Sequence, residues 1–126
     1  MGMILANIEL SNPRNRDLKS MPVNALVDTR AMTICIPEQI ALQLQLKEIE
    51  KREVTTADDQ SHVVAYVGPI QIKFENRTCF TGALVFGQSV LMGAVPMEDM
   101  DLVISPSRQT ITVNPQSPNI PSAMVK

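Results

Sequence analysis

Hydrophobic and polar positions alternate along most of this chain with the period of a β-strand. In the first segment the apolar residues recur at Ile4, Ala6, Ile8 and Leu10. A strand with one buried face repeats every second residue, so this spacing predicts a strand. Similar short apolar segments predict further strands at Val23–Val27, Thr33–Ile36, Glu53–Ala57, Val63–Val67, Ile70–Glu75, Cys79–Phe86, Val90–Ala94, Asp101–Ile104 and Thr110–Val113.

One segment has helical spacing instead. Pro37 suits the first position of a helix, and Glu38 suits the positive end of the helix dipole. Apolar residues then recur on one face from Ile40 onward, which predicts a helix from Pro37 to about Leu46. A shorter stretch, Pro96–Met100, is expected to form a single helical turn.

These elements predict a small all-β domain. Glu53–Ala57 and Val63–Val67 flank a polar tip at Asp58–Ser61, which is typical of a β-hairpin. Many short strands with one main helix indicate a closed β-barrel or a sandwich. Residues 1–115 hold this pattern, and the proline-containing residues 116–126 are expected to form an extended C-terminal tail.

Composition narrows the classes of function. The chain has 126 residues, enough for one domain, and its core must be aliphatic because 44% of the residues are hydrophobic but only 3% are aromatic. A net charge of −2 argues against the basic surface that nucleic-acid binding requires. No apolar run approaches the roughly 18 residues that cross a bilayer, and the N-terminus lacks the charged flank of a signal peptide. A cytoplasmic protein without a membrane partner is therefore expected.

The two cysteines, Cys35 and Cys79, lie in apolar, strand-like segments and are predicted to be free, buried thiols. Together with His62 they are too few for a structural zinc site, so neither a metal nor another cofactor is expected. Because the chain contains both cysteine and histidine, a cysteine nucleophile activated by His62 is an alternative. His62 is expected in a polar turn, and nothing near either thiol indicates activation.

The most informative segment is Ala25–Ala31, in which Asp28 directly follows an apolar strand. A carboxylate at the end of a buried strand costs free energy unless hydrogen bonds satisfy it. Taken alone, Asp28 is consistent with an ordinary turn residue that bonds its own backbone. The functional interpretation gains support only from the rest of the chain.

Two motifs resemble those of the retropepsin-like single-domain aspartic proteases, which include retroviral proteases and bacterial relatives. Their active-site motif is two apolar residues, Asp, Thr or Ser, Gly and Ala. Residues 26–29, with Asp28 and Thr29, match it, and so does Ala31, whereas Arg30 stands where the family has glycine. The family's second motif, two apolar residues and a glycine before a short helix, is matched by Leu91, Met92, Gly93 and Ala94. The resemblance extends from about Ile4 to Pro115 and is to the bacterial members in particular.

The resemblance implies a homodimer that acts as an aspartic endopeptidase. Such enzymes use two carboxylates that share one proton, because like charges about 3 Å apart cannot both ionise. This chain has one Asp-Thr turn, so the second carboxylate would come from Asp28 of a second copy. Thr29 would brace the two turns. A flap hairpin with Ala57, Asp58 and Asp59 at its tip would close over a peptide or protein substrate.

Two residues depart from the family pattern. Arg30 replaces a glycine that lets the substrate backbone approach, so its side chain would fill that space, or pair with Asp28 and favour the ionised carboxylate. Alternatively, Arg30 points outward or binds an acidic group of the substrate. Asp59 replaces the usual glycine of the flap tip, where a positive φ is expected, and aspartate tolerates that conformation better than most residues.

The sequence leaves three interpretations. The first is an active endopeptidase centred on Asp28, and the second is a catalytically impaired dimeric peptide-binding module that is blocked by Arg30. The third is a small β-domain in which Asp28 is only a turn residue.

Overall fold

The computed structural model describes residues 3–125, which form short strands and two short helices. The helices are α1 (Glu38–Gln43) and α2 (Ala94–Asp99), each of six residues. The strands are β1 (Leu5–Ser11), β2 (Met21–Val27), β3 (Ile34–Ile36), β4 (Lys47–Thr55), β5 (Ser61–Phe74), β6 (Arg77–Val85), β7 (Leu91–Met92), β8 (Leu102–Ser105) and β9 (Thr110–Val113).

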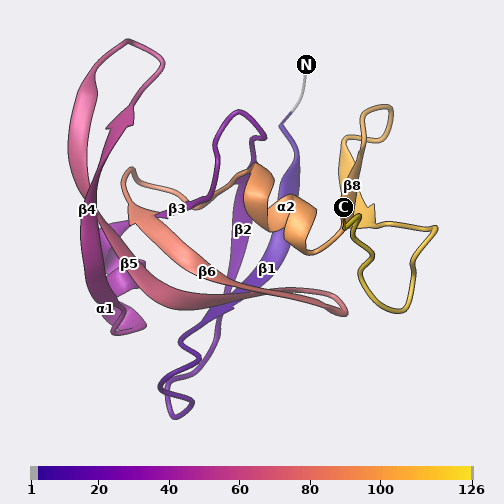
Figure 1. Cartoon of the computed structure of the whole chain (residues 1–126), viewed down its shortest axis with the longest axis horizontal. Helices are drawn as coiled ribbons and strands as arrows, with labels where there is room; N and C mark the ends of the chain where they lie inside the picture. Colours follow the sequence, from indigo (N-terminus) through magenta and orange to yellow (C-terminus); the bar gives the residue numbers. More distant parts are fainter. Residues whose placement is uncertain (1–2, 126) are drawn as a thin grey trace.

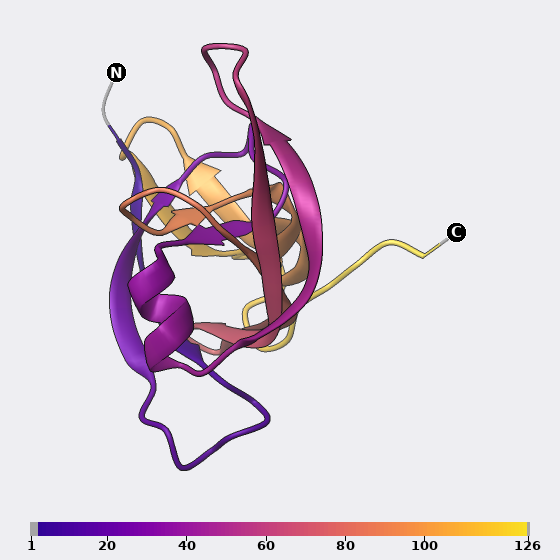
Figure 2. The same ribbon diagram turned by 90° about the vertical axis from the view of Figure 1, so that its left-hand side faces the viewer.

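The main sheet closes on itself. Its seven strands run in the order β1-β2-β7-β3-β6-β5-β4, and β1 also pairs with β5, where Leu10 lies opposite Ile72. Six strands therefore form a ring, and β4 is added outside it along β5. Figure 2 shows this ring with α1 in front of its opening and the β4–β5 hairpin projecting beyond it. The predicted all-β class with a closed sheet is confirmed.

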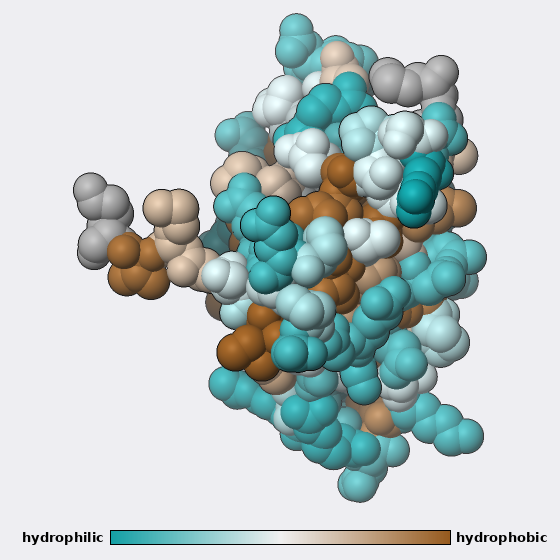
Figure 3. Space-filling view, turned by 90° about the vertical axis from the view of Figure 1, so that its right-hand side faces the viewer, coloured by the Kyte–Doolittle hydropathy of each residue, from teal (hydrophilic) through white to brown (hydrophobic). Residues whose placement is uncertain are grey.

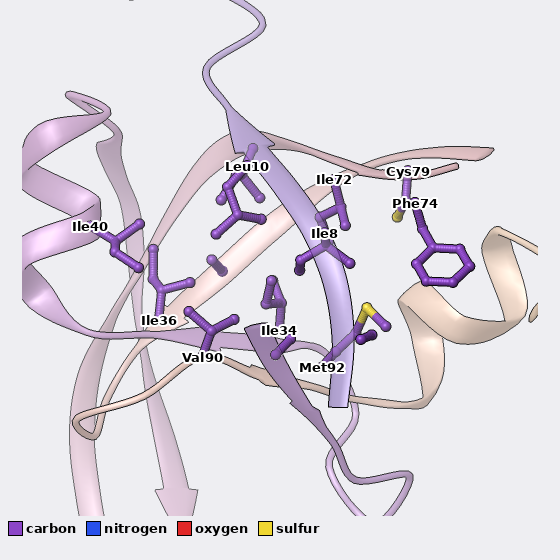
Figure 4. Packing of buried hydrophobic residues seen from close by; sticks show 14 of the residues in the cluster. Ile8, Leu10, Ile34, Ile36, Ile40, Ile72, Phe74, Cys79, Val90 and Met92 are labelled. Carbon is purple, nitrogen blue, oxygen red and sulfur yellow. The ribbon is translucent and has the colours of Figure 1, made fainter. Parts of the chain in front are cut away.

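An aliphatic core fills the ring (Figure 4). The alternation predicted for the first strand is real, because Ile8 and Leu10 of β1 are 2% and 0% exposed. Ile34 of β3, Ile72 of β5 and Met92 of β7 meet them from other strands, and each is fully buried. Burying one such side chain contributes about 1.5–3 kcal/mol, so these contacts fix the positions of the strand ends.

The first helix is shorter than predicted. α1 ends at Gln43 rather than near Leu46, because Gln45 takes the left-handed conformation, with φ of 52°, and turns the chain into β4. β4 begins at Lys47 and not at Glu53. Almost all of its side chains are exposed, so no apolar alternation marks its first half.

Several other boundaries also differ from the prediction. β5 is one continuous strand through Gly68-Pro69, and the interruption that the proline suggested is a bulge between Val67 and Ile70 in the pairing with β6. β7 is limited to Leu91–Met92 because α2 begins at Ala94, two residues before the predicted helical turn. At the hairpin tip, β4 ends at Thr55 rather than at Ala57, and β5 begins at Ser61 rather than at Val63.

Residues 114–122 form a C-terminal strap over Asp101. The carboxylate of Asp101 accepts hydrogen bonds from the Asn114 side chain at 3.1 Å, the Ser117 hydroxyl at 2.5 Å and the Ser122 amide at 2.9 Å. The buried Arg77 guanidinium donates to the Ser117 carbonyl. The strap, together with β8 and β9, makes up the right-hand side of the molecule in Figure 1.

Candidate active site

Asp28 lies immediately after β2, at the point where this strand leaves the sheet. The end of β2 runs parallel to β7, with Val27 opposite Met92. The amide of Asp28 donates a hydrogen bond to the carbonyl of Met92 at 3.0 Å, and the amide of Val27 donates to Ile4 at 2.9 Å. Strand β7 on one side and Ile4, just before β1, on the other therefore fix the backbone that carries the carboxylate.

The turn that follows is closed by its own hydrogen bonds. The amide of Ala31 donates to the carbonyl of Asp28 at 3.1 Å, and the amide of Arg30 donates to Oδ1 of Asp28 at 3.0 Å. The second contact is the Asx turn that an ordinary turn aspartate also makes. The local hydrogen bonding alone therefore does not separate a structural Asp28 from a catalytic one.

Gly93 brings the second motif directly against this turn. Its amide donates to the carbonyl of Thr33 at 2.9 Å, and the amide of Ala94 donates to the carbonyl of Ala31 at 2.8 Å. A Cβ atom on Gly93 would lie 2.5 Å from the carbonyl oxygens of Ala31 and Thr33. Only glycine permits this approach, so the structure joins the two motifs that the sequence analysis paired.

Arg30 folds back onto Asp28 in a bidentate ion pair. Its Nε lies 3.0 Å from Oδ1, and its Nη2 lies 3.1 Å from Oδ2. The hydrogen bonds from the Arg30 side chain, followed by the one from its amide, hold the pKa of Asp28 below its usual value, although burial opposes them. The Arg30 side chain is 89% exposed, so water screens the pair. Arg30 thus favours the ionised form of the Asp28 carboxylate.

The β4–β5 hairpin has the positive-φ tip that was expected. Asp59 has φ of 66°, and its amide donates to the carbonyl of Thr56 at 2.9 Å. The Asp58 carboxylate accepts hydrogen bonds from the Thr56 hydroxyl and from the Gln60 amide, and these bonds lower the pKa of Asp58. Aspartate at both positions therefore organises a tight, polar tip.

A groove of about 570 Å³ lies between the acidic turn and this hairpin. Arg30 and Ala31 line it on one side, and Arg52 and Thr56 line it on the other. Its apolar wall includes Met32, Val54, Leu84, Leu91 and Val95. Asp28 touches this groove only through its partner Arg30, and the tip residues Ala57, Asp58 and Asp59 lie outside the lining.

Thr29 faces a different, smaller hollow. This hollow of about 340 Å³ is lined by Thr29 together with Ala94, Met97, Glu98, Leu102 and Ile104. Leu102 and Ile104 belong to β8, and the face that carries β8 shows apolar surface framed by hydrophilic residues (Figure 3). The acidic turn therefore has a groove on one side and an apolar hollow on the other.

No sequence pattern had predicted a role for Arg52 or Tyr66 in the site. The Arg52 guanidinium lies 3.6 Å from the centre of the Tyr66 ring, and both residues line the groove. The ring occupies the space that a side chain on Gly82 would need. The available signal was the hairpin register, because Tyr66 pairs with Glu50 and is thereby a diagonal neighbour of Arg52.

The thiols show no sign of activation. Burial raises the pKa of Cys35, and burial together with a hydrogen bond to Asp99 raises the pKa of Cys79 to about 12. Both cysteines are free, as predicted, although Cys35 is only half-buried. His62 lies in β5 beside Phe86, not in a polar turn.

Within residues 3–125, no three metal-binding side chains gather into a site. In the same part of the chain, no helix has the length and apolar character needed to cross a membrane.

No protein-family model matches the sequence, and no curated protein matches it either. Solved structures similar to the chain include the solution structure of simian foamy virus (mac) protease, with 17% identity and a TM-score of 0.49 over 74% of this chain and 90% of that one. A foamy viral protease–reverse transcriptase in complex with double-stranded DNA has 16% identity and a TM-score of 0.49, over 72% of this chain but 14% of that one. A Legionella pneumophila protein of unknown function has 16% identity and a TM-score of 0.46, over 85% of this chain and 95% of that one. At these values the fold class follows from the strand pairing above and not from the similarity.

Proposed function

We propose that this chain, through residues 1–115, is one half of a homodimeric, retropepsin-like aspartic endopeptidase of the cytoplasm. The observation that carries the proposal is the setting of Asp28. Its backbone is fixed between β1 and β7, the glycine of a second motif packs against its turn, and a groove of about 570 Å³ begins at its partner Arg30. An isolated turn aspartate needs none of these features.

In this proposal Asp28 and the partner's Asp28 share one proton. The ionised carboxylate takes a proton from water as the water oxygen bonds to the scissile carbonyl carbon, and the protonated carboxylate donates its proton to the carbonyl oxygen. The carbon–nitrogen bond then breaks as that oxygen returns its proton and the amine nitrogen takes up the other. Every proton therefore stays within the dyad, the water and the peptide.

The second copy would dock on the face that carries Thr29. This residue borders the apolar hollow formed with Met97, Leu102 and Ile104, and apolar area next to a polar turn is what a dimer interface needs. The peptide would occupy the groove on the other side of the turn. The β4–β5 hairpin would act as the flap, with Ala57, Asp58 and Asp59 closing over the bound chain.

A second candidate function is a dimeric peptide-binding module without hydrolysis. The bidentate pair between Arg30 and Asp28 favours it, because a guanidinium on each carboxylate stabilises two ionised groups and removes the shared proton. The same groove would then hold a peptide that is never cut.

Peptide cleavage at mildly acidic pH by the native chain, Arg30→Gly and Asp28→Asn distinguishes these functions. For the endopeptidase, we expect Arg30→Gly to raise the rate by about tenfold or more, since acid–base catalysis by a correctly protonated group contributes about 10²- to 10⁴-fold. Asp28→Asn should abolish cleavage. Arg108→Gln, an exposed arginine outside the groove lining, is the matched control and should leave the rate unchanged.

If Asp28→Asn cleaves as fast as the native chain, the catalytic assignment is wrong. If no variant cleaves while all of them bind peptide, the binding module is the correct function. A pepstatin-like inhibitor adds a second measurement, because binding to a working dyad should be linked to proton uptake, whereas a permanently ionised pair should not bind it.

A further inference from the structure

The charges around the groove are unequal. Three charged residues line it, Arg30, Arg52 and Glu53, while most of its remaining wall is apolar. The carboxylates that pair with the two arginines, Asp28 and Glu50, are not part of the lining. A ligand in the groove therefore meets two guanidinium groups and one carboxylate.

Arg30 retains unused hydrogen-bonding capacity. Its Nε and Nη2 bind Asp28, whereas its Nη1 makes no hydrogen bond within residues 3–125. The side chain is 89% exposed. A planar guanidinium binds carboxylates in a fork, so a second carboxylate can share Arg30 or replace Asp28 on it.

Arg52 is held differently. Its guanidinium stacks over Tyr66 at 3.6 Å, and its Nε lies 2.7 Å from Glu50. Two contacts therefore fix Arg52, whereas Arg30 is tied only to residue 28. Of the two arginines, Arg30 is the one that can change partner at little cost.

We propose that the groove selects extended, apolar peptides that carry one acidic side chain, whose carboxylate takes the place of Asp28 as the partner of Arg30. The inference rests on the peptide groove of the proposed function and adds a substrate class to it. Binding of such a peptide frees the Asp28 carboxylate from its arginine. The residue that blocks the dyad in the empty groove thus becomes the specificity residue in the occupied one.

The test uses two labelled heptapeptides with blocked termini, built from valine, leucine and alanine around a central glutamate or glutamine. Fluorescence anisotropy with the full chain gives both dissociation constants. We expect the glutamate peptide to bind about two- to fivefold more tightly, the range of a solvent-exposed charge pair. The preference should shrink as ionic strength rises.

Substitutions test whether the preference for the glutamate peptide depends on Arg30. Arg30→Gln should abolish it, and Arg30→Lys should retain only part of it because an ammonium is not a fork. Asp28→Asn removes the competing carboxylate, so the glutamate peptide should bind more tightly to this variant than to the native chain and should gain more affinity than the glutamine peptide does. Arg108→Gln, which carries the same charge change outside the groove, should keep the full preference.

Equal binding of both peptides to the native chain overturns the inference, and so does a preference that survives Arg30→Gln in a variant with native circular dichroism. Weaker binding of the glutamate peptide to Asp28→Asn also contradicts it. Cleavage is scored separately with the same peptides. Cleavage without preference refutes only the inference, and preference without cleavage refutes only the endopeptidase.

Discussion

Asp28 and Arg30 lie two positions apart, and the turn between them brings the guanidinium within 3.0 Å of the carboxylate. Both residues of the pair belong to the same chain, so the pair does not depend on a second copy. Its first consequence is electrostatic, because hydrogen bonds from the Arg30 side chain and amide hold the pKa of Asp28 below its ordinary value in the folded chain. A lowered folded-state pKa stabilises the fold above the unfolded pKa, and this stabilisation is lost as pH falls through the folded value.

Arg30→Gln should therefore destabilise the chain in a pH-dependent way. At about pH 7 we expect a loss of at most about 1 kcal/mol, because the arginine is exposed and the pair is screened. The difference from the native chain should shrink between about pH 7 and about pH 2, because Asp28 takes up protons as the pH falls and the ion pair is lost. Urea unfolding at both pH values measures this difference in the free energy of unfolding.

Arg108→Gln is the control for the charge change, since it removes an exposed arginine that is outside the groove lining. A destabilisation by Arg30→Gln that is the same at both pH values, or larger in acid, would contradict the role given to the ion pair.

At the residue scale the sequence indicated several structural features of the candidate site. The position of Asp28 after a strand, the glycine at 93 and the positive φ of Asp59 follow from chemistry that is visible in the sequence. The sequence left the direction of Arg30 open, because it depends on a side-chain rotamer. The role of Asp101 in holding the C-terminal strap was also not predictable, since its three donors are brought together only by the fold.

At the scale of elements, the alternation of apolar and polar residues predicted the strands that have one buried face. It did not predict strand ends at which no face is buried. β1 was predicted because its apolar residues point into the ring, whereas the first half of β4 has exposed side chains throughout. The closure between β1 and β5 and the parallel pairs β2–β7 and β3–β6 join distant segments. Local periodicity carries no information on such pairings.

The hairpin tip depends on the left-handed conformation of Asp59. Asp59→Val should weaken it by about 1–2 kcal/mol, since a β-branched residue strongly disfavours positive φ. We expect faster hydrogen exchange at the amides of Thr56 and Asp59, whose acceptors are within the tip. Asp59→Asn should exchange like the native chain. Native protection in the valine variant would show that the tip does not need this conformation.

At the scale of the whole molecule, the two sides of the acidic turn have different surroundings. The groove lies toward the β4–β5 hairpin, and the apolar hollow beside Thr29 lies toward β8. In Figure 1 the hairpin and β8 are on opposite sides of the ring. A second copy docked at the hollow would leave the groove open for a peptide.

Ile104→Glu should therefore disrupt the proposed dimer. A charge placed in the hollow would be buried without a partner, which should weaken dimerisation by about tenfold or more. Sedimentation velocity over a concentration series measures the shift toward monomer. Gln43→Glu on α1, at the far side of the molecule, has the same charge change and should sediment like the native chain. If a folded Ile104→Glu variant dimerises as well as the native chain, the interface does not include this hollow.

The most direct test is a crystal structure of the assembly that sedimentation detects in solution. If each subunit supplies half of a reaction centre, the carboxylates of Asp28 and of the partner's Asp28 will lie about 3 Å apart across a two-fold axis. Carboxylates on separate surfaces of the assembly, or a chain that stays monomeric at every concentration, would contradict the account.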